Sequence, residues 1–215
     1  MEPDGDVDAD MGELTPEAQQ MLAGMLQQAQ GEAPGEPSPM SAVLEASEAG
    51  NLQAMVESLD SYGLDINEKG DEGDTALHIG CLYGHLAIVQ ECLRRGATAT
   101  ATDEDGSTPL HDASAGGYYE IAKLLLEHGA LVDAFDGDGD SPLHLAANGG
   151  HGNVAELLLL RAGAERRTSL LSTANSSGYK PVDLAEDPAL VAQLRLEESA
   201  EDEASVGAAF KKGRA

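Results

Sequence analysis

Six histidines, two cysteines and a run of alternating aspartates are the residues of this 215-residue chain whose types could support chemistry. An imidazole can bind a metal or move a proton, a thiolate can act as a nucleophile, and aspartate oxygens suit a hard cation such as calcium. The spacing of each set decides among these uses. The histidines stand at positions 78, 85, 111, 128, 144 and 151.

Five of the six histidines occupy one of two positions in a phrase that recurs every 33 residues. His78, His111 and His144 share the first position, and His85 and His151 share the second. A catalytic or metal-binding imidazole would not need a copy in every unit. We therefore interpret these histidines as structural groups that bond backbone and cap atoms between neighbouring loops.

The aspartate run and the cysteines do not form a recognisable reactive site either. DGDGD at 136–140 could begin a calcium loop, but the twelfth position, which needs a glutamate, is Ala147. We favour an acidic hairpin tip. Neither Cys81 nor Cys92 belongs to a CxxC pair or stands beside a convincing base, and no GxxxxGK[ST] phosphate loop occurs. We predict that the protein is not an enzyme and carries no cofactor or metal.

The repeated phrase reads DTALHIGCLYGH at 74–85, GSTPLHDASAGG at 106–117 and DSPLHLAANGGH at 140–151. Each copy is followed by an aliphatic stretch that ends in Gly-Ala: AIVQECLRRGA, EIAKLLLEHGA and NVAELLLLRAGA. Self-similarity at a fixed period of this length is typical of a stacked repeat array. The elements that position any site must therefore be read from one unit.

The residue pattern of one unit predicts two short helices. Thr108 can accept an amide hydrogen bond at a helix start, and Pro109 suits the first helical position because its missing N–H costs nothing there. Gly116 and Gly117 permit a tight reversal, and a second helix over 119–127 carries an apolar stripe. A single unit cannot bury its apolar face, so stacked neighbours must supply the core.

These phrases resemble the ankyrin repeat, with clear matches over 70–166. The resemblance implies an all-α solenoid of four to five helix-turn-helix units with hairpin-like loops, and the composition of the flanks predicts disordered acidic tails. We expect a repeat domain over 41–190, with Ser41 capping the first helix and an enlarged loop at Arg166–Ser176. Its expected parts are a degenerate N-terminal unit 41–69, regular repeats 70–102, 103–135 and 136–169, and a degenerate C-terminal repeat 174–190.

The expected tails are residues 1–40 and 191–215. The first holds nine acidic residues and no Lys or Arg, a composition that favours disorder. Within it, Met21, Leu22, Met25 and Leu26 could form a short helix that docks on a partner, or a transient helix only. The second is acidic and then basic, ending in KKGRA, which is a weak localisation signal at most.

The charge balance restricts the partner. The chain has 12 Lys and Arg residues and 39 Asp and Glu residues, which gives a formal net charge of −27. Such a surface repels nucleic acid and anionic lipid and favours a protein partner with exposed Lys or Arg. The longest aliphatic run, Leu157–Leu160, is too short to span a bilayer, so we expect no direct membrane insertion. We expect a cytoplasmic monomer, with the nucleus as the alternative location.

The resemblance also places a binding site. In ankyrin proteins the loop tips and inner helices line a concave face that holds protein partners. Glu72, Asp105 and Asp138 stand 33 residues apart, so stacking should align them as an acidic ladder; the alternative is that these loops only keep the array soluble. The candidate partner-binding residues are Asp71, Glu72, Tyr83, Asp103, Glu104, Asp105, Asp112, Tyr118, Asp136, Asp138 and Asn148.

Three functions fit this pattern. The first is a non-catalytic adaptor or scaffold whose concave ankyrin face holds a basic protein. The second is an escort chaperone for a basic client such as a ribosomal protein. The third is a cytosolic targeting factor for membrane-anchor segments, which would need an apolar client site.

Overall fold

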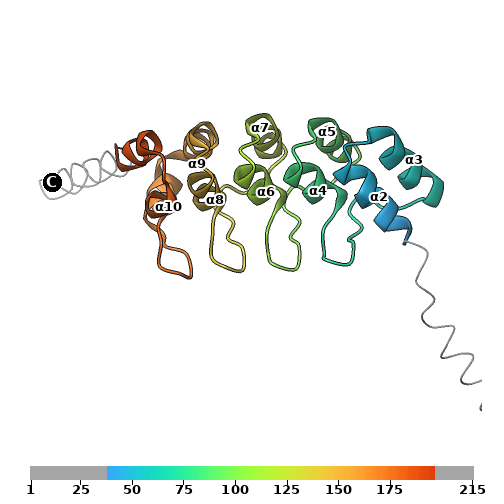
Figure 1. Cartoon of the computed structure of the whole chain (residues 1–215), viewed down its shortest axis with the longest axis horizontal. Coiled ribbons are helices and arrows are strands. Elements are labelled where there is room, and N and C mark those ends of the chain that lie inside the picture. Colours follow the sequence, from blue (N-terminus) through green and yellow to red (C-terminus); the bar gives the residue numbers. More distant parts are fainter. Residues whose placement is uncertain (1–37, 197–215) are drawn as a thin grey trace, which may run out of the picture. The chain divides into compact units, whose positions relative to one another are not determined.

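Five helix pairs follow one another along residues 38–196, the part of the chain that this computed structural model describes. No strand occurs within that range, and the predicted all-α solenoid is confirmed (Figure 1). The Met21–Leu26 stripe and the C-terminal KKGRA lie outside it. The pairs are α2 (Pro39–Glu48) with α3 (Leu52–Tyr62), α4 (Ala76–Leu82) with α5 (Leu86–Arg94), α6 (Pro109–Ala115) with α7 (Tyr119–Glu127), α8 (Pro142–Asn148) with α9 (Gly152–Ser172), and α10 (Pro181–Leu184) with the helical residues 188–196.

The helices form two layers. The first helix of each pair lies beside the first helix of the next, from α2 through α4, α6 and α8 to α10, and the second helices α3, α5, α7 and α9 form the other layer (Figure 1). The loops that join successive pairs extend from the first layer. Leu77, Leu110 and Leu143, one from each regular repeat, are fully buried in a continuous apolar core.

We call the first helix of each pair the inner helix and the second the outer helix. The repeated histidines stabilise the starts of the inner helices α4, α6 and α8. The backbone N–H groups of Thr75, Thr108 and Ser141 donate to Nδ1 of the histidine three residues later, at 3.3, 3.0 and 3.1 Å. A ring nitrogen that accepts this bond leaves the proton on Nε2, which can donate to the next repeat. Nε2 of His111 does so to the Asp140 carbonyl at 3.1 Å, and Nε2 of His144 to the Tyr179 carbonyl at 3.2 Å.

The second set of histidines bonds across the helix turns. Nε2 of His85 lies 2.8 Å from the Glu48 carbonyl, and Nε2 of His151 lies 3.0 Å from the Ala115 carbonyl, each in the preceding repeat. The predicted structural role of the repeated histidines is therefore confirmed. His78 differs in one contact, because its Nε2 is buried without a hydrogen-bond partner among the described residues.

These contacts predict how the capping histidines titrate. Burial lowers the pKa of His78, His111 and His144 below 6.5, and nearby carboxylates oppose it in part. Because the unfolded chain then binds protons more readily, the stability that these rings contribute is present above pH 6.5 and lost as the pH falls through their lower folded values. In an NMR titration of the ring C–H signals, the three midpoints should lie below those of the same rings in urea. Midpoints equal to the unfolded values would contradict the neutral cap.

Two details of the degenerate units differ from expectation. Ser41 does not cap the first helix, because α2 begins two residues earlier at Pro39, where proline suits the first helical position. The expected enlarged loop at Arg166–Ser176 is helical as far as Ser172. The chain leaves helical geometry at Gly163 (φ 70°, ψ 167°) and resumes it, since a helix lets Leu170 and Leu171 reach the core, where each is almost fully buried.

Candidate protein-binding site

The connecting loops are hairpin-like, and their tips are tied to one another. A backbone hydrogen bond closes each loop across its tip, and two further bonds join neighbouring tips. The closing bonds run from Gly70 N–H to the Asp74 carbonyl (2.8 Å), from Asp103 to Ser107 (3.0 Å), from Asp136 to Asp140 (3.0 Å) and from Asn175 to Tyr179 (2.9 Å). Between tips, the Gly137 N–H donates to the Asp105 carbonyl at 2.7 Å, and the Ser176 N–H to the Asp138 carbonyl at 2.9 Å.

Two of the candidate contact residues, Asp103 and Asp136, also build their own loops. Oδ1 of Asp103 accepts the Ser107 N–H at 2.8 Å. Oδ1 of Asp136 accepts the N–H groups of Asp138 at 3.0 Å and Asp140 at 2.8 Å. One oxygen of each carboxylate is thus occupied by hydrogen bonds from its own loop. For Asp136, the first aspartate of DGDGD, this is a structural role that does not involve a cation.

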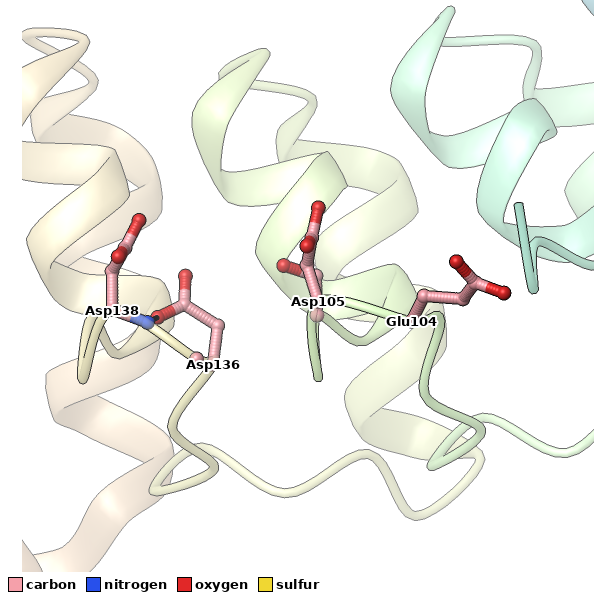
Figure 2. A pocket seen from close by; sticks show the side chains of 6 residues that line it. Glu104, Asp105, Asp136 and Asp138 are labelled. Atoms are coloured by element: carbon pink, nitrogen blue, oxygen red, sulfur yellow. Dashed lines mark hydrogen bonds between the residues drawn. The ribbon is translucent and has the colours of Figure 1, made fainter.

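The other acidic tip residues, Asp71, Glu72, Glu104, Asp105 and Asp138, are exposed. Between the second and third tips lies a hollow of about 450 Å³ lined by Glu104, Asp105, Ser107, Asp136, Gly137 and Asp138. Figure 2 shows the side chains of Asp105, Asp136 and Asp138 pointing to the same side, while Glu104 points toward the preceding loop. No basic side chain lines this hollow within the described part of the chain, so its potential is negative.

The inner helix α6 carries a half-buried carboxylate, Asp112, which is not among the residues that line the hollow. Burial raises the pKa of Asp112 to about 8, and the charges of Asp103 and Asp74 raise it further in the same direction. Burial also raises the pKa of Asp74, together with repulsion from Asp103, Glu72 and Asp105. Carboxylates from three successive segments therefore repel one another on the inner face, and a cation placed among them would be stabilised.

Arg94, Arg95, Arg161 and Arg166 form ion pairs on the outer helices and beside them. Arg95 binds Asp60 and Glu91 at 2.7 Å each, and Arg94 binds Glu91 at 2.6 Å. Arg161 pairs with Glu127 at 3.6 Å, and Arg166 pairs with Asp133 at 3.5 Å. None of these pairs includes Glu72, Asp105 or Asp138, so these four arginines do not neutralise the acidic loop tips.

The two candidate tyrosines and Asn148 lie near the helix turns, at the opposite end of the inner helices from the loops. Tyr83 is exposed, stacks on His85 with ring centroids 6.4 Å apart, and has its pKa raised by Glu48. The Tyr118 ring lies directly against the backbone of Gly84 and Gly116, in the place that histidine holds in neighbouring repeats. Asn148 is exposed at the end of α8.

The comparisons with known proteins agree with this architecture. A family model described as ankyrin repeats (3 copies) matches residues 40–136 and 102–169, which is more than half of the chain. The chain belongs to the ankyrin-repeat family. It is also similar to human protein phosphatase 1 regulatory subunit 27, with 44% identity over 68 residues. That match covers 32% of this chain and 44% of the human protein, so it spans less than half of that relative.

Ankyrin repeats are protein–protein interaction modules, and the family is generally non-catalytic. The ankyrin helices described here include none that is both long and apolar enough to cross a bilayer. The predicted ankyrin architecture and the coarse function of protein binding are thus confirmed.

Sequence reasoning missed one member of the ankyrin inner face, Asp74. It stands directly before the cap residue Thr75, as Asp140 stands before Ser141, and this position was the available signal. The two differ in their surroundings, because Oδ1 of Asp140 accepts a hydrogen bond from the Asn175 side chain at 2.8 Å. Asp74 instead interacts with Asp103 of the next loop, and each affects the pKa of Asp112.

Proposed function

We propose that this ankyrin-repeat protein is a non-catalytic adaptor that binds a basic protein segment along its inner helices and loop tips. The observation that supports this is the group of mutually repelling carboxylates Asp74, Asp103 and Asp112, continued by the acidic hollow at Asp105 and Asp138. A lysine or arginine of a partner would relieve that repulsion and let Asp112 ionise, so binding and proton release would be coupled.

The adaptor function is favoured over the two alternatives by one further observation. The human relative is named as a regulatory subunit of a phosphatase, and a regulatory subunit acts by binding another protein. An escort chaperone for a basic client would use the same acidic surface, whereas a targeting factor for membrane anchors would need an apolar one. Both described thiols, Cys81 and Cys92, are free and buried, which suits the proposed cytoplasmic location.

Salt dependence and a matched pair of variants test this function. Proteins captured by the full chain from a cell extract at low salt should be basic and should dissociate at moderate salt, because screening weakens attraction between exposed charges. The double variant Asp105→Asn, Asp138→Asn should weaken binding of a captured protein by roughly 2- to 5-fold for each carboxylate removed. Purified partner and fluorescence anisotropy give the affinities.

The control removes the same number of charges elsewhere. Glu156→Gln with Glu186→Gln changes two exposed carboxylates outside the loop tips and should leave the affinity within about twofold of the wild-type value. Equal binding by the loop-tip variant and the wild type, or binding that salt does not weaken, would contradict the proposal. A captured protein that stays soluble only while bound would favour the chaperone alternative.

A further inference from the structure

A second surface lies on the outer layer, between α5 and α7. One hollow of about 330 Å³ is lined mainly by the apolar and aromatic side chains of Leu86, Tyr118, Tyr119 and Ile121. Glu120, Gly84 and Asn153 of α9 complete the lining. A smaller hollow of about 110 Å³ adjoins it, since both are lined by Leu86 and Glu120. Together they form a groove that begins at the helix turns and continues between α5 and α7, helices that lie in the outer layer in Figure 1.

The apolar end of this groove includes side chains that the next repeat junction in the described region lacks. Leu86 is 37% exposed and Tyr119 is 36% exposed. At the next junction, between α7 and α9, the positions of Tyr118 and Tyr119 are taken by His151 and Gly152. Stacking of repeats therefore does not require Tyr119, whereas Tyr118 fills the place against the helix turns that histidine holds in neighbouring repeats. An exposed apolar hollow is typical of an interaction surface.

The charges around the groove indicate its occupant. Glu120 has no ion pair within the described residues, whereas Glu127 at the far end of α7 is paired with Arg161. The net charge of −27 disfavours a second copy of the chain. Lys123 is the one basic residue that lines the groove in the described region, and it is three residues from Glu120 on α7. A partner with a cation close to its apolar anchor fits the rim at Glu120.

We propose that the groove between α5 and α7 binds a protein segment in which one large apolar side chain is flanked by lysine or arginine. The apolar side chain enters the hollow of Leu86, Tyr118 and Tyr119, and the basic side chain binds the Glu120 carboxylate. This surface is formed by outer helices and differs from the acidic loop tips, so the proposal does not depend on the function proposed above.

Selection of random dodecapeptides displayed on phage against the full chain provides a defined probe. Enriched peptides should combine a large apolar residue with Lys or Arg within a few positions. Their affinities are then measured for four proteins by fluorescence anisotropy. Leu86→Gln should weaken binding at least about tenfold, and Glu120→Gln by roughly 2- to 5-fold with a smaller salt dependence. Leu160→Gln, at a leucine on α9 that is 69% exposed, is the matched control and should bind as the wild type does.

Several results would overturn the proposal. These are the absence of enriched peptides, enriched peptides without an apolar residue, or equal affinity for Leu86→Gln and the wild type. Peptides that bind the Leu86→Gln protein but no longer bind the Asp105→Asn protein would place the occupant at the loop tips. Self-association of the chain that Leu86→Gln abolishes would instead identify a second copy as the occupant. If Leu86→Gln lowers the melting temperature, Tyr119→Ser serves as the second groove variant, and unchanged peptide binding by it would equally reject the proposal.

Discussion

Replacing Leu110 by alanine should lower the free energy of unfolding by roughly 2–5 kcal/mol. Leu110 is fully buried on α6, the inner helix at the centre of the array. The loss combines the transfer free energy of the missing carbons with a cavity that the neighbouring repeats cannot close. Because each repeat is stabilised by the next, the damage should extend to the adjacent units. Urea unfolding followed by circular dichroism measures the change.

Leu131→Ala is the matched control for this prediction. It removes the same atoms from a leucine that is 51% exposed in a connecting loop, and surface changes of this kind stay within about 0.5 kcal/mol. Similar unfolding curves for Leu110→Ala and the wild type would show that the core is not at the inner layer.

Asp112→Asn should stabilise the protein by roughly 2–4 kcal/mol at pH 7, because each unit by which a pKa is shifted corresponds to about 1.4 kcal/mol. The pKa of Asp112 is raised to about 8 by burial and by Asp103 and Asp74, whereas an unfolded aspartate ionises near 3.9. The asparagine has a similar shape and needs no proton, so it avoids the free energy of holding a carboxyl group protonated.

The pH dependence gives the sign of this effect a separate test. A raised folded pKa means that the folded state binds more protons than the unfolded chain, so the contribution of Asp112 is favourable below about pH 4 and is lost as the pH rises toward 8. The gain in Asp112→Asn should accordingly be small at pH 4, grow with pH and level off above 8. Asp71→Asn, at an exposed loop-tip residue, should show no such growth. A gain that is the same at pH 4 and pH 8 would contradict the raised pKa.

Much of the fold could be predicted from the sequence because its determinants are local and repeated. Thr108, Pro109 and His111 define a helix start within four residues, and three copies in register imply that the units stack. The extra helical segment could not be predicted in this way. Gly163 does adopt the positive φ expected at a helix end, but Leu170 and Leu171 find a buried site only when the last repeats are assembled, and that burial makes the segment helical.

The place of the acidic candidate residues at the loop tips was predictable, but their hydrogen bonds were not. The exposure of Asp105 and Asp138 follows from their place at loop tips. Asp103 and Asp136 have the same residue type and lie two residues away, yet their carboxylates accept hydrogen bonds from their own loops. This difference depends on the direction of each side chain, which the loop backbone sets.

The sequence by itself determined the repeat period, because the phrase recurs in register every 33 residues. It also determined the starts of α4, α6 and α8, because each cap residue and its histidine lie within one helical turn. Only the tertiary structure decided two properties of the surface, the pKa of Asp112 and the groove between α5 and α7. The raised pKa of Asp112 depends on Asp74 and Asp103, which belong to separate loops, and the groove between α5 and α7 depends on how closely two outer helices approach. Both properties depend on distances between groups in different repeats, so the sequence of a single repeat does not determine them.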